Sequence, residues 1–163
     1  SPKENSATIN KLCVDNQRLQ TNNDILMKKI DSLEQFNQKN NVEIQMVPEK
    51  SNENPLNLFK KLCSSISFPI RTSEILACHR VPQSNKNSGR PKNIVVELPS
   101  MKYYNKCGER IEHLDISGKT PIYVSEHLTP TNKELHASVC HAAKEKNIKF
   151  VWLRNGKIYI RKD

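Results

Sequence analysis

The chain has 163 residues, which is enough for one ordinary domain or two small ones. Only 36% of the residues are hydrophobic, 26% are charged and the mean hydropathy is −0.70. This composition excludes a membrane span and argues against one large core that fills the chain. The net charge of +9 favours a polyanionic partner, either nucleic acid or an anionic membrane. Residues 129–163 alone carry +5 of that excess.

The five cysteines are an odd number, and none forms a Cys-x-x-Cys pair. This spacing is not typical of a disulfide scaffold or a zinc ribbon, and reduced thiols are usual inside cells. The sequence shows no signal peptide and no lipidation motif. We therefore expect an intracellular protein, located in the cytoplasm, the nucleus or both, that does not bind membranes.

Residues 1–40 carry a heptad repeat, with no glycine or proline between Lys3 and Val47. Apolar and asparagine side chains recur at alternating steps of three and four, and every d position from 12 to 33 is leucine. The residues expected to drive oligomerisation are Ile9, Leu12, Asn16, Leu19, Asn23, Leu26, Ile30 and Leu33. This pattern predicts a coiled coil. The alternative is an amphipathic helix packed on its own domain, but the rest of the helix surface is almost entirely polar.

The polar a positions indicate how many helices pair and in which direction. Asn16 and Asn23 would each meet their counterpart in a parallel two-stranded coil, which fixes register and strand number at a cost in stability. Lys29 at a g position can reach Glu34 at an e position of a parallel partner. We therefore expect a parallel homodimer.

Residues 41–127 predict a small α+β sandwich. The expected strands are 41–46, 74–81, 94–98 and 121–124, and the expected helices are 55–67 and 101–114, capped by Asn54 and Ser100. The order strand, helix, strand, strand, helix, strand is that of a ferredoxin-like or RNA-recognition-motif (RRM) fold. The strand 94–98 has no Phe or Tyr where the RRM stacks bases, so we do not expect this sheet to bind RNA.

The last segment predicts a helix followed by a β-hairpin. Thr129 can cap a helix over 130–147, with Leu135, Val139 and Ala142 facing inward. Asn155-Gly156 between two alternating runs is the strongest short hairpin signal and predicts a type I′ turn. The fold class is thus α+β in three parts: a coiled coil (1–40), an RRM-like domain (41–127) and a C-terminal helix–hairpin domain (128–163).

The two-residue turn fixes which side chains share a face of the hairpin. An apolar face for packing on the helix holds Val151, Leu153, Ile158 and Ile160. The opposite face holds Phe150, Trp152, Arg154, Lys157, Tyr159 and Arg161. Aromatic rings stack on unpaired bases and cations neutralise phosphates, so this outer face predicts binding of single-stranded nucleic acid. The alternative is that Trp152 and Tyr159 are buried against the neighbouring domain.

Other candidate sites are weaker. His136 and Cys140 lie one helical turn apart, but without a second matched pair we expect no metal site. Cys78-His79-Arg80 could line a groove, or Arg80 could pair with a carboxylate such as Glu97. Neither a glycine-rich turn nor paired carboxylates accompany these residues, so we expect no catalytic residue, no enzyme activity and no cofactor.

Two parts of the sequence resemble known families. The leucine-heptad helix, the strand Asn-Asn-Val-Glu-Ile followed by Pro-Glu, and Cys78-His79-Arg80-Val81 resemble the first-open-reading-frame proteins of LINE-type retrotransposons. The segments 121–130 and 150–161 resemble the C-terminal domain of the baculovirus few-polyhedra (FP) protein family, which insect retroelement proteins share. The resemblance implies a self-associating protein that binds single-stranded RNA or DNA, often acts as a nucleic-acid chaperone, and in some relatives forms trimers.

The resemblance also implies that basic residues of a cleft between the sandwich and the C-terminal domain contact nucleic acid. By position these are Arg80, Arg90, Lys92 and Arg154. The hairpin adds Lys149, Trp152, Lys157, Tyr159 and Arg161. The alternative function is a structural assembly protein, in which the coil and the hairpin bind other proteins and the charge serves solubility or an acidic partner.

Overall fold

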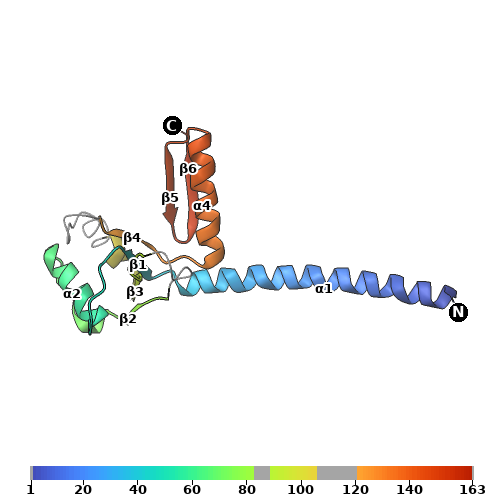
Figure 1. Ribbon diagram of the computed structural model, residues 1–163, viewed down its shortest axis with the longest axis horizontal. Helices are drawn as coiled ribbons and strands as arrows, with labels where there is room; N and C mark the ends of the chain where they lie inside the picture. Colours follow the sequence, from blue (N-terminus) through green and yellow to red (C-terminus); the bar gives the residue numbers. More distant parts are fainter. Residues whose placement is uncertain (1, 83–88, 106–120, 163) are drawn as a thin grey trace. The chain divides into compact units, whose positions relative to one another are not determined.

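The computed structural model describes residues 2–82, 89–105 and 121–162, and Figure 1 labels its elements. Helices and strands are mixed as predicted: a long N-terminal helix, a four-stranded antiparallel sheet, and a C-terminal helix followed by a two-stranded hairpin. The chain forms two compact units, Ser1–Phe36 and Asn37–Asp163. Among the described residues, no helix combines the length and the apolar character that a membrane crossing requires.

Helix α1 (Pro2–Asn37) contains none of the protein's core, because none of its residues is buried. The leucines of the heptad repeat are exposed, for example Leu12 by 62% and Leu33 by 64%. The helix ends at Asn37, three residues before the predicted limit of the coil, since Asn41 begins the first strand. Its a and d side chains therefore form an apolar stripe that this unit does not cover.

The sheet has the topology that the sequence predicts. Its strands are β1 (Asn41–Gln45), β2 (Ala77–Arg80), β3 (Ile94–Glu97) and β4 (Tyr123–Glu126), in the order β2-β3-β1-β4 with every pair antiparallel. Strands β1 and β3 lie side by side at its centre, which is the arrangement of the split βαβ fold.

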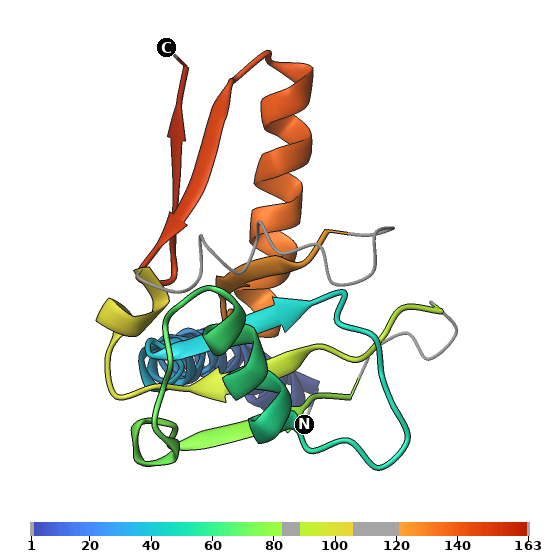
Figure 2. The ribbon, with the colours of Figure 1, turned by 90° about the vertical axis from the view of Figure 1, so that its left-hand side faces the viewer.

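Helix α2 (Pro55–Ser65) packs on one face of this sheet and closes the core (Figure 2). The side chain of Asn54 accepts a hydrogen bond from the amide of Asn57, and Pro55 occupies the first turn, as the sequence predicts. The buried side chains of α2 are Phe59, Leu62 and Cys63, and they belong to one cluster with the central strands. Burial of one such large apolar side chain stabilises the fold by about 1.5–3 kcal/mol.

Two strand boundaries differ from the prediction. The second strand was expected from Glu74, but Thr72–Glu74 form a 3-10 turn, η1, and β2 begins at Ala77. The turn forms because the Glu74 carboxylate accepts a hydrogen bond from the Arg71 amide at 2.8 Å. Strand β4 lies two residues later than predicted. Of the predicted helix over 101–114, residues 101–105 are helical and the remainder, with Cys107, lies outside the described residues.

Helix α4 (Pro130–Glu145) leads into the hairpin of β5 (Phe150–Arg154) and β6 (Lys157–Arg161). Thr129 is fully buried, and its hydroxyl accepts a hydrogen bond from the Asn132 amide. The predicted inward face of α4 is confirmed at Val139 but wrong by one position at Leu135 and Ala142. Leu135 is 51% exposed and Ala142 is exposed, whereas the more buried side chains are His136, Val139, Cys140 and Ala143. These four are spaced by three, one and three residues and form the stripe beside the hairpin.

Candidate nucleic-acid interface

The hairpin has the predicted turn and the predicted register. Asn155 and Gly156 have φ angles of 53° and 69°, the left-handed conformation that a type I′ turn requires at both positions. Strands β5 and β6 then pair Arg154 with Lys157, and Trp152 with Tyr159. Side chains that alternate along each strand are therefore sorted onto two faces, as expected.

A carboxylate of the sheet holds this turn. The Glu126 carboxylate accepts hydrogen bonds from the amides of Asn155 at 2.9 Å and Gly156 at 2.6 Å. Sequence reasoning missed Glu126, because nothing in the sequence links a residue at the end of β4 to a turn about thirty positions later. The contact fixes the hairpin against the end of the sheet.

The outer face of the hairpin carries the aromatic pair. The rings of Trp152 and Tyr159 are stacked, with centroids 5.6 Å apart and planes inclined by 15°. Trp152 is 42% exposed and Tyr159 is 40% exposed. The alternative in which both rings are buried against the sandwich is therefore wrong, and part of each ring is accessible to a ligand.

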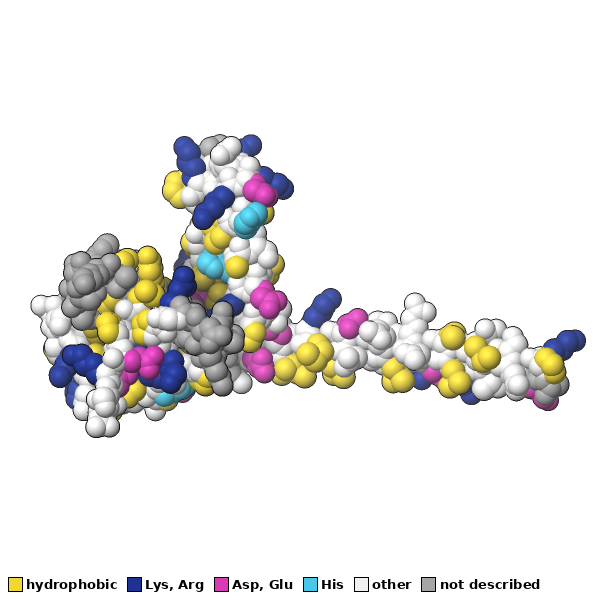
Figure 3. Space-filling view, viewed as in Figure 1, with side chains coloured by type: hydrophobic (Ala, Val, Ile, Leu, Met, Phe, Trp, Pro, Cys, Tyr) yellow, Lys and Arg dark blue, Asp and Glu magenta, His cyan; other side chains and the backbone are white. Residues whose placement is uncertain are grey.

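Cations surround this pair. The Arg161 guanidinium lies 4.6 Å from the centroid of the Phe150 ring, a distance typical of a cation–π contact. Lys149, Arg154 and Lys157 are exposed. Figure 3 shows that Lys and Arg side chains gather around the end of the helix–hairpin segment that carries the C-terminus. Phe150 belongs to this surface, on the outer face where the sequence places it.

The inner face of the hairpin is only partly covered. Helix α4 packs on β5, and Val151, Leu153 and Ile158 are half-buried. Ile160, which was expected to pack with them, is 56% exposed. The apolar and basic faces are separated as predicted, but the end of β6 lies outside the cover that the helix provides.

Arg80 does not fit the predicted interface. Its guanidinium forms a two-point ion pair with Glu53, with the shorter contact at 2.6 Å, and donates further hydrogen bonds to the backbone carbonyls of Val47, Pro48 and Lys92. The Arg80 side chain is only 10% exposed. Hydrogen bonding to Arg80 lowers the pKa of Glu53 below its ordinary value. Since its donors are engaged inside the protein, Arg80 cross-links the sandwich instead of facing a phosphate.

The other two sandwich cations of the prediction lie near one end of β3. The Lys92 ammonium is 4.0 Å from a Glu49 carboxylate oxygen, and the Lys92 amide donates to the same side chain. Arg90 is exposed. Neither residue belongs to the hairpin face, so the structure does not bring the predicted nucleic-acid residues into one set.

A cavity of about 300 Å³ lies where the sheet, α4 and the hairpin meet, but its lining is not the expected basic cleft. The lining residues are Glu43, Gln45, Asn93, Ser125, Glu126, Leu128, Lys133, His136 and Leu153. The Lys133 ammonium is 2.8 Å from the buried carboxylate of Glu43, which also accepts a hydrogen bond from Asn93. The one lysine of this lining is therefore already neutralised, and none of the four predicted cleft cations lines the cavity.

The sheet face opposite α2 has no stacking platform on its two central strands. Glu43 lies at the centre of β1, directly opposite Val95 of β3. Buried carboxylate and aliphatic side chains here offer no ring to a base. On the same face, the exposed ring of Tyr123 lies on the edge strand β4, opposite Gln45.

The weaker candidate sites gain no support. The His136 ring nitrogen lies 3.6 Å from the Cys140 sulfur, but the described residues contain no group of three or more possible metal ligands. Burial raises the pKa of the Cys78 thiol to about 11. A thiol with that pKa is protonated at neutral pH and is a poor nucleophile.

Comparison with known proteins supports one of the two resemblances. Residues 129–163 match the family model described as baculovirus FP protein domain 2. No curated protein gives a significant match. The matched segment is the α4–β5–β6 unit together with its capping residue Thr129. The C-terminal segment of this chain is therefore similar to domain 2 of the baculovirus FP proteins.

Proposed function

We propose that this chain is a self-associating protein that binds single-stranded RNA or DNA with little sequence preference. The observation that carries the proposal is the exposed Trp152–Tyr159 stack, which lies between the cation pair Arg154–Lys157 and the Arg161–Phe150 pair of the same hairpin face. Every base has a flat π surface, so rings of this kind accept any base.

The arrangement favours single strands over duplexes. A base can stack on a protein ring only when it is not paired inside a helix, and each such contact contributes roughly 1–3 kcal/mol. The exposed cations of the hairpin add affinity through counterion release, which depends steeply on salt.

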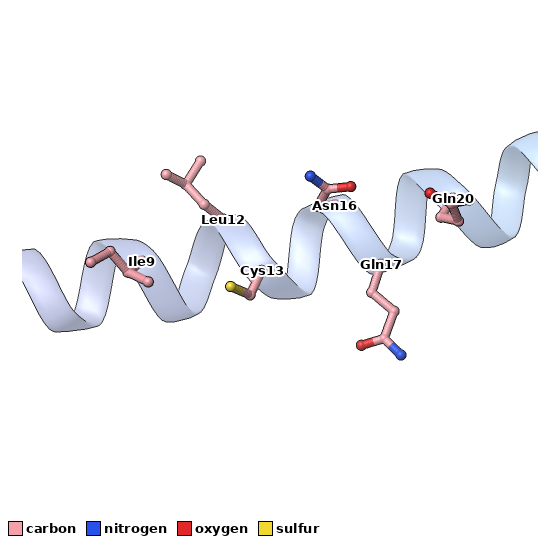
Figure 4. A pocket seen from close by; sticks show the side chains of 6 residues that line it. All are labelled: Ile9, Leu12, Cys13, Asn16, Gln17 and Gln20. Atoms are coloured by element: carbon pink, nitrogen blue, oxygen red, sulfur yellow. The ribbon is translucent and has the colours of Figure 1, made fainter.

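Self-association is proposed from α1. A single helix with an open apolar stripe gains little from its own fold, and most helical stability in proteins comes from packing of such a face. Figure 4 shows a shallow groove on α1, lined by Ile9, Leu12, Cys13, Asn16, Gln17 and Gln20. In a coiled coil a groove of this kind receives a side chain of the partner helix. We propose a parallel homodimer, with a trimer as the alternative that some relatives suggest.

The two activities support each other. Two hairpins joined through a coil bind one polynucleotide with an affinity well above that of a single hairpin. The similarity of residues 129–163 to FP protein domain 2 fits this proposal. The LINE-type resemblance of the remaining chain extends it to a retroelement or viral protein that coats RNA and acts as a nucleic-acid chaperone.

The test is direct binding of labelled single-stranded oligonucleotides of mixed sequence to the full chain, measured by fluorescence anisotropy over a range of salt concentrations. We expect binding that weakens steeply with salt and is stronger for single strands than for the matching duplex. If the chain does not bind the oligonucleotides near physiological salt, the proposal is wrong and the alternative function, a structural assembly module, is favoured.

A further inference from the structure

Two cations face each other across the hairpin beside its turn. Arg154 is the direct cross-strand partner of Lys157, and both side chains are exposed. Like charges in directly opposite positions destabilise a strand pair. Within the part of the chain that the structure describes, neither residue forms an ion pair. The hairpin therefore places two cations opposite each other, and no described carboxylate lies within ion-pair distance of either one.

The backbone holds this cation pair in place. Arg154 and Lys157 directly flank the two-residue turn, and both turn amides donate to Glu126. The Glu126 carboxylate keeps its negative charge, but its hydrogen bonds go to the two turn amides, and it forms no described ion pair with Arg154 or Lys157. Cross-strand partners have Cβ atoms about 4.5–5.5 Å apart, so both side chains can reach one small anion.

The aromatic pair follows at the next position of the same face. Trp152 and Tyr159 lie two residues farther along their strands, a step of about 7 Å. This step is similar to the distance between a phosphate and the base of the neighbouring nucleotide in an extended strand. The hairpin thus presents a site for an anion and then a site for a flat ring, in line.

We propose that Arg154 and Lys157 together hold one phosphate of a single strand, and that the base of the adjoining nucleotide stacks on the Trp152–Tyr159 pair. This inference rests on the proposed function and specifies the ligand of that site as a phosphate–base step. The bound phosphate removes the repulsion between the two cations. The free hairpin is consequently less stable than it would be without them.

The test uses Arg154→Gln, Lys157→Gln and the double variant in the full chain. Affinity for a labelled oligodeoxythymidylate is measured by anisotropy, and thermal unfolding is measured without ligand. We expect each single variant to weaken binding, and the double variant to weaken it by less than the product of the two single factors, because both cations serve one phosphate. We also expect each single variant to raise the Tm of the free protein. Lys50→Gln/Lys61→Gln, which removes two exposed sandwich charges, is the matched control.

The outcomes separate this inference from the proposed function. Strictly multiplicative effects, or a loss no larger than that of the control, overturn the shared phosphate while binding through Trp152 can still stand. An unchanged or lowered Tm in both single variants also overturns it, because the repulsion would then be absent. If the wild-type chain does not bind the oligonucleotide, the proposed function itself fails.

Discussion

The Trp152 indole lies nearly parallel to the phenol ring of Tyr159 across the hairpin, with 15° between the planes. Both residues are about two-fifths exposed, so the stack is neither a core contact nor a pair of isolated surface rings.

Trp152→Ala should weaken single-strand binding by about 5- to 150-fold, which corresponds to a loss of roughly 1–3 kcal/mol of stacking. Anisotropy with a labelled oligonucleotide measures the change. Tyr123→Ala removes another exposed ring, 53% accessible, from the edge strand β4 and is the matched control. Equal losses in both variants would contradict a role specific to the hairpin.

Glu126→Gln should loosen the hairpin turn. A glutamine carbonyl can accept hydrogen bonds, but its NH₂ group cannot accept from the second turn amide. Hydrogen bonds to a charged group contribute about 1.5–3 kcal/mol, so amide exchange at Asn155 and Gly156 should accelerate by more than tenfold. NMR-detected hydrogen exchange reports both amides. Unchanged exchange, with Glu145→Gln as the control at an exposed carboxylate, would show that the contact does not hold the turn.

Arg80→Ala should destabilise the sandwich by about 3–5 kcal/mol, because it leaves Glu53 without its partner in a mostly buried position. Denaturant unfolding measures the loss, and the double variant Arg80→Ala/Glu53→Gln should recover part of it. Oligonucleotide affinity at a temperature where the variant is folded should stay near the wild-type value. If Arg80→Ala keeps its stability but loses affinity for the oligonucleotide, Arg80 contacts nucleic acid and the structural role is wrong.

The sandwich should lose stability in acid through Glu74. Hydrogen bonds from the Arg71 amide, the Arg71 side chain and the Tyr103 hydroxyl lower the pKa of Glu74 to about 2. A group with a lowered folded-state pKa stabilises the fold above its ordinary pKa near 4.5, and this contribution disappears as the pH falls towards 2. The Tm difference between the wild type and Glu74→Gln should therefore shrink over that range. A Tm difference that stays constant over this pH range would show that the Glu74 carboxylate does not stabilise the sandwich in this way.

Leu12→Asp should abolish self-association, because it places a charge in the apolar seam of the proposed coil. Light scattering after size exclusion should give a two-chain mass for the wild type and a one-chain mass for the variant. Val14→Asp, at an exposed apolar residue outside the a and d positions, should remain dimeric. A wild-type mass of three chains would contradict the dimer and show that the chain forms a trimer.

The predicted parts of the fold are those that local sequence determines. The Asn155-Gly156 turn fixed the complete register of β5 and β6, because a type I′ turn permits one alignment of the flanking residues. The strand order followed from the order of elements. The inward face of α4 was partly missed because Leu135 is more apolar than His136, yet the packing position and not hydropathy decides which of two adjacent residues faces the hairpin.

The candidate site was only partly predictable for a related reason. The two faces of the hairpin follow from alternation, but the roles of Arg80 and Glu126 depend on long-range contacts. Arg80 meets Glu53 and two carbonyls of the segment between β1 and α2, together with the carbonyl of Lys92 just before β3. Glu126 meets amides of a distant turn. The sequence left open that Arg80 pairs with a carboxylate such as Glu97, but it did not identify Glu53 as the partner.

The most direct measurement uses Trp152, the only tryptophan in the chain, as an intrinsic probe of the proposed surface. Its fluorescence is followed while the full-length protein is titrated with an unlabelled single-stranded oligonucleotide. The account predicts strong quenching that saturates with the binding curve, and much weaker quenching by an oligomer that carries the same phosphates without bases. Binding that leaves the emission of Trp152 unchanged would contradict it.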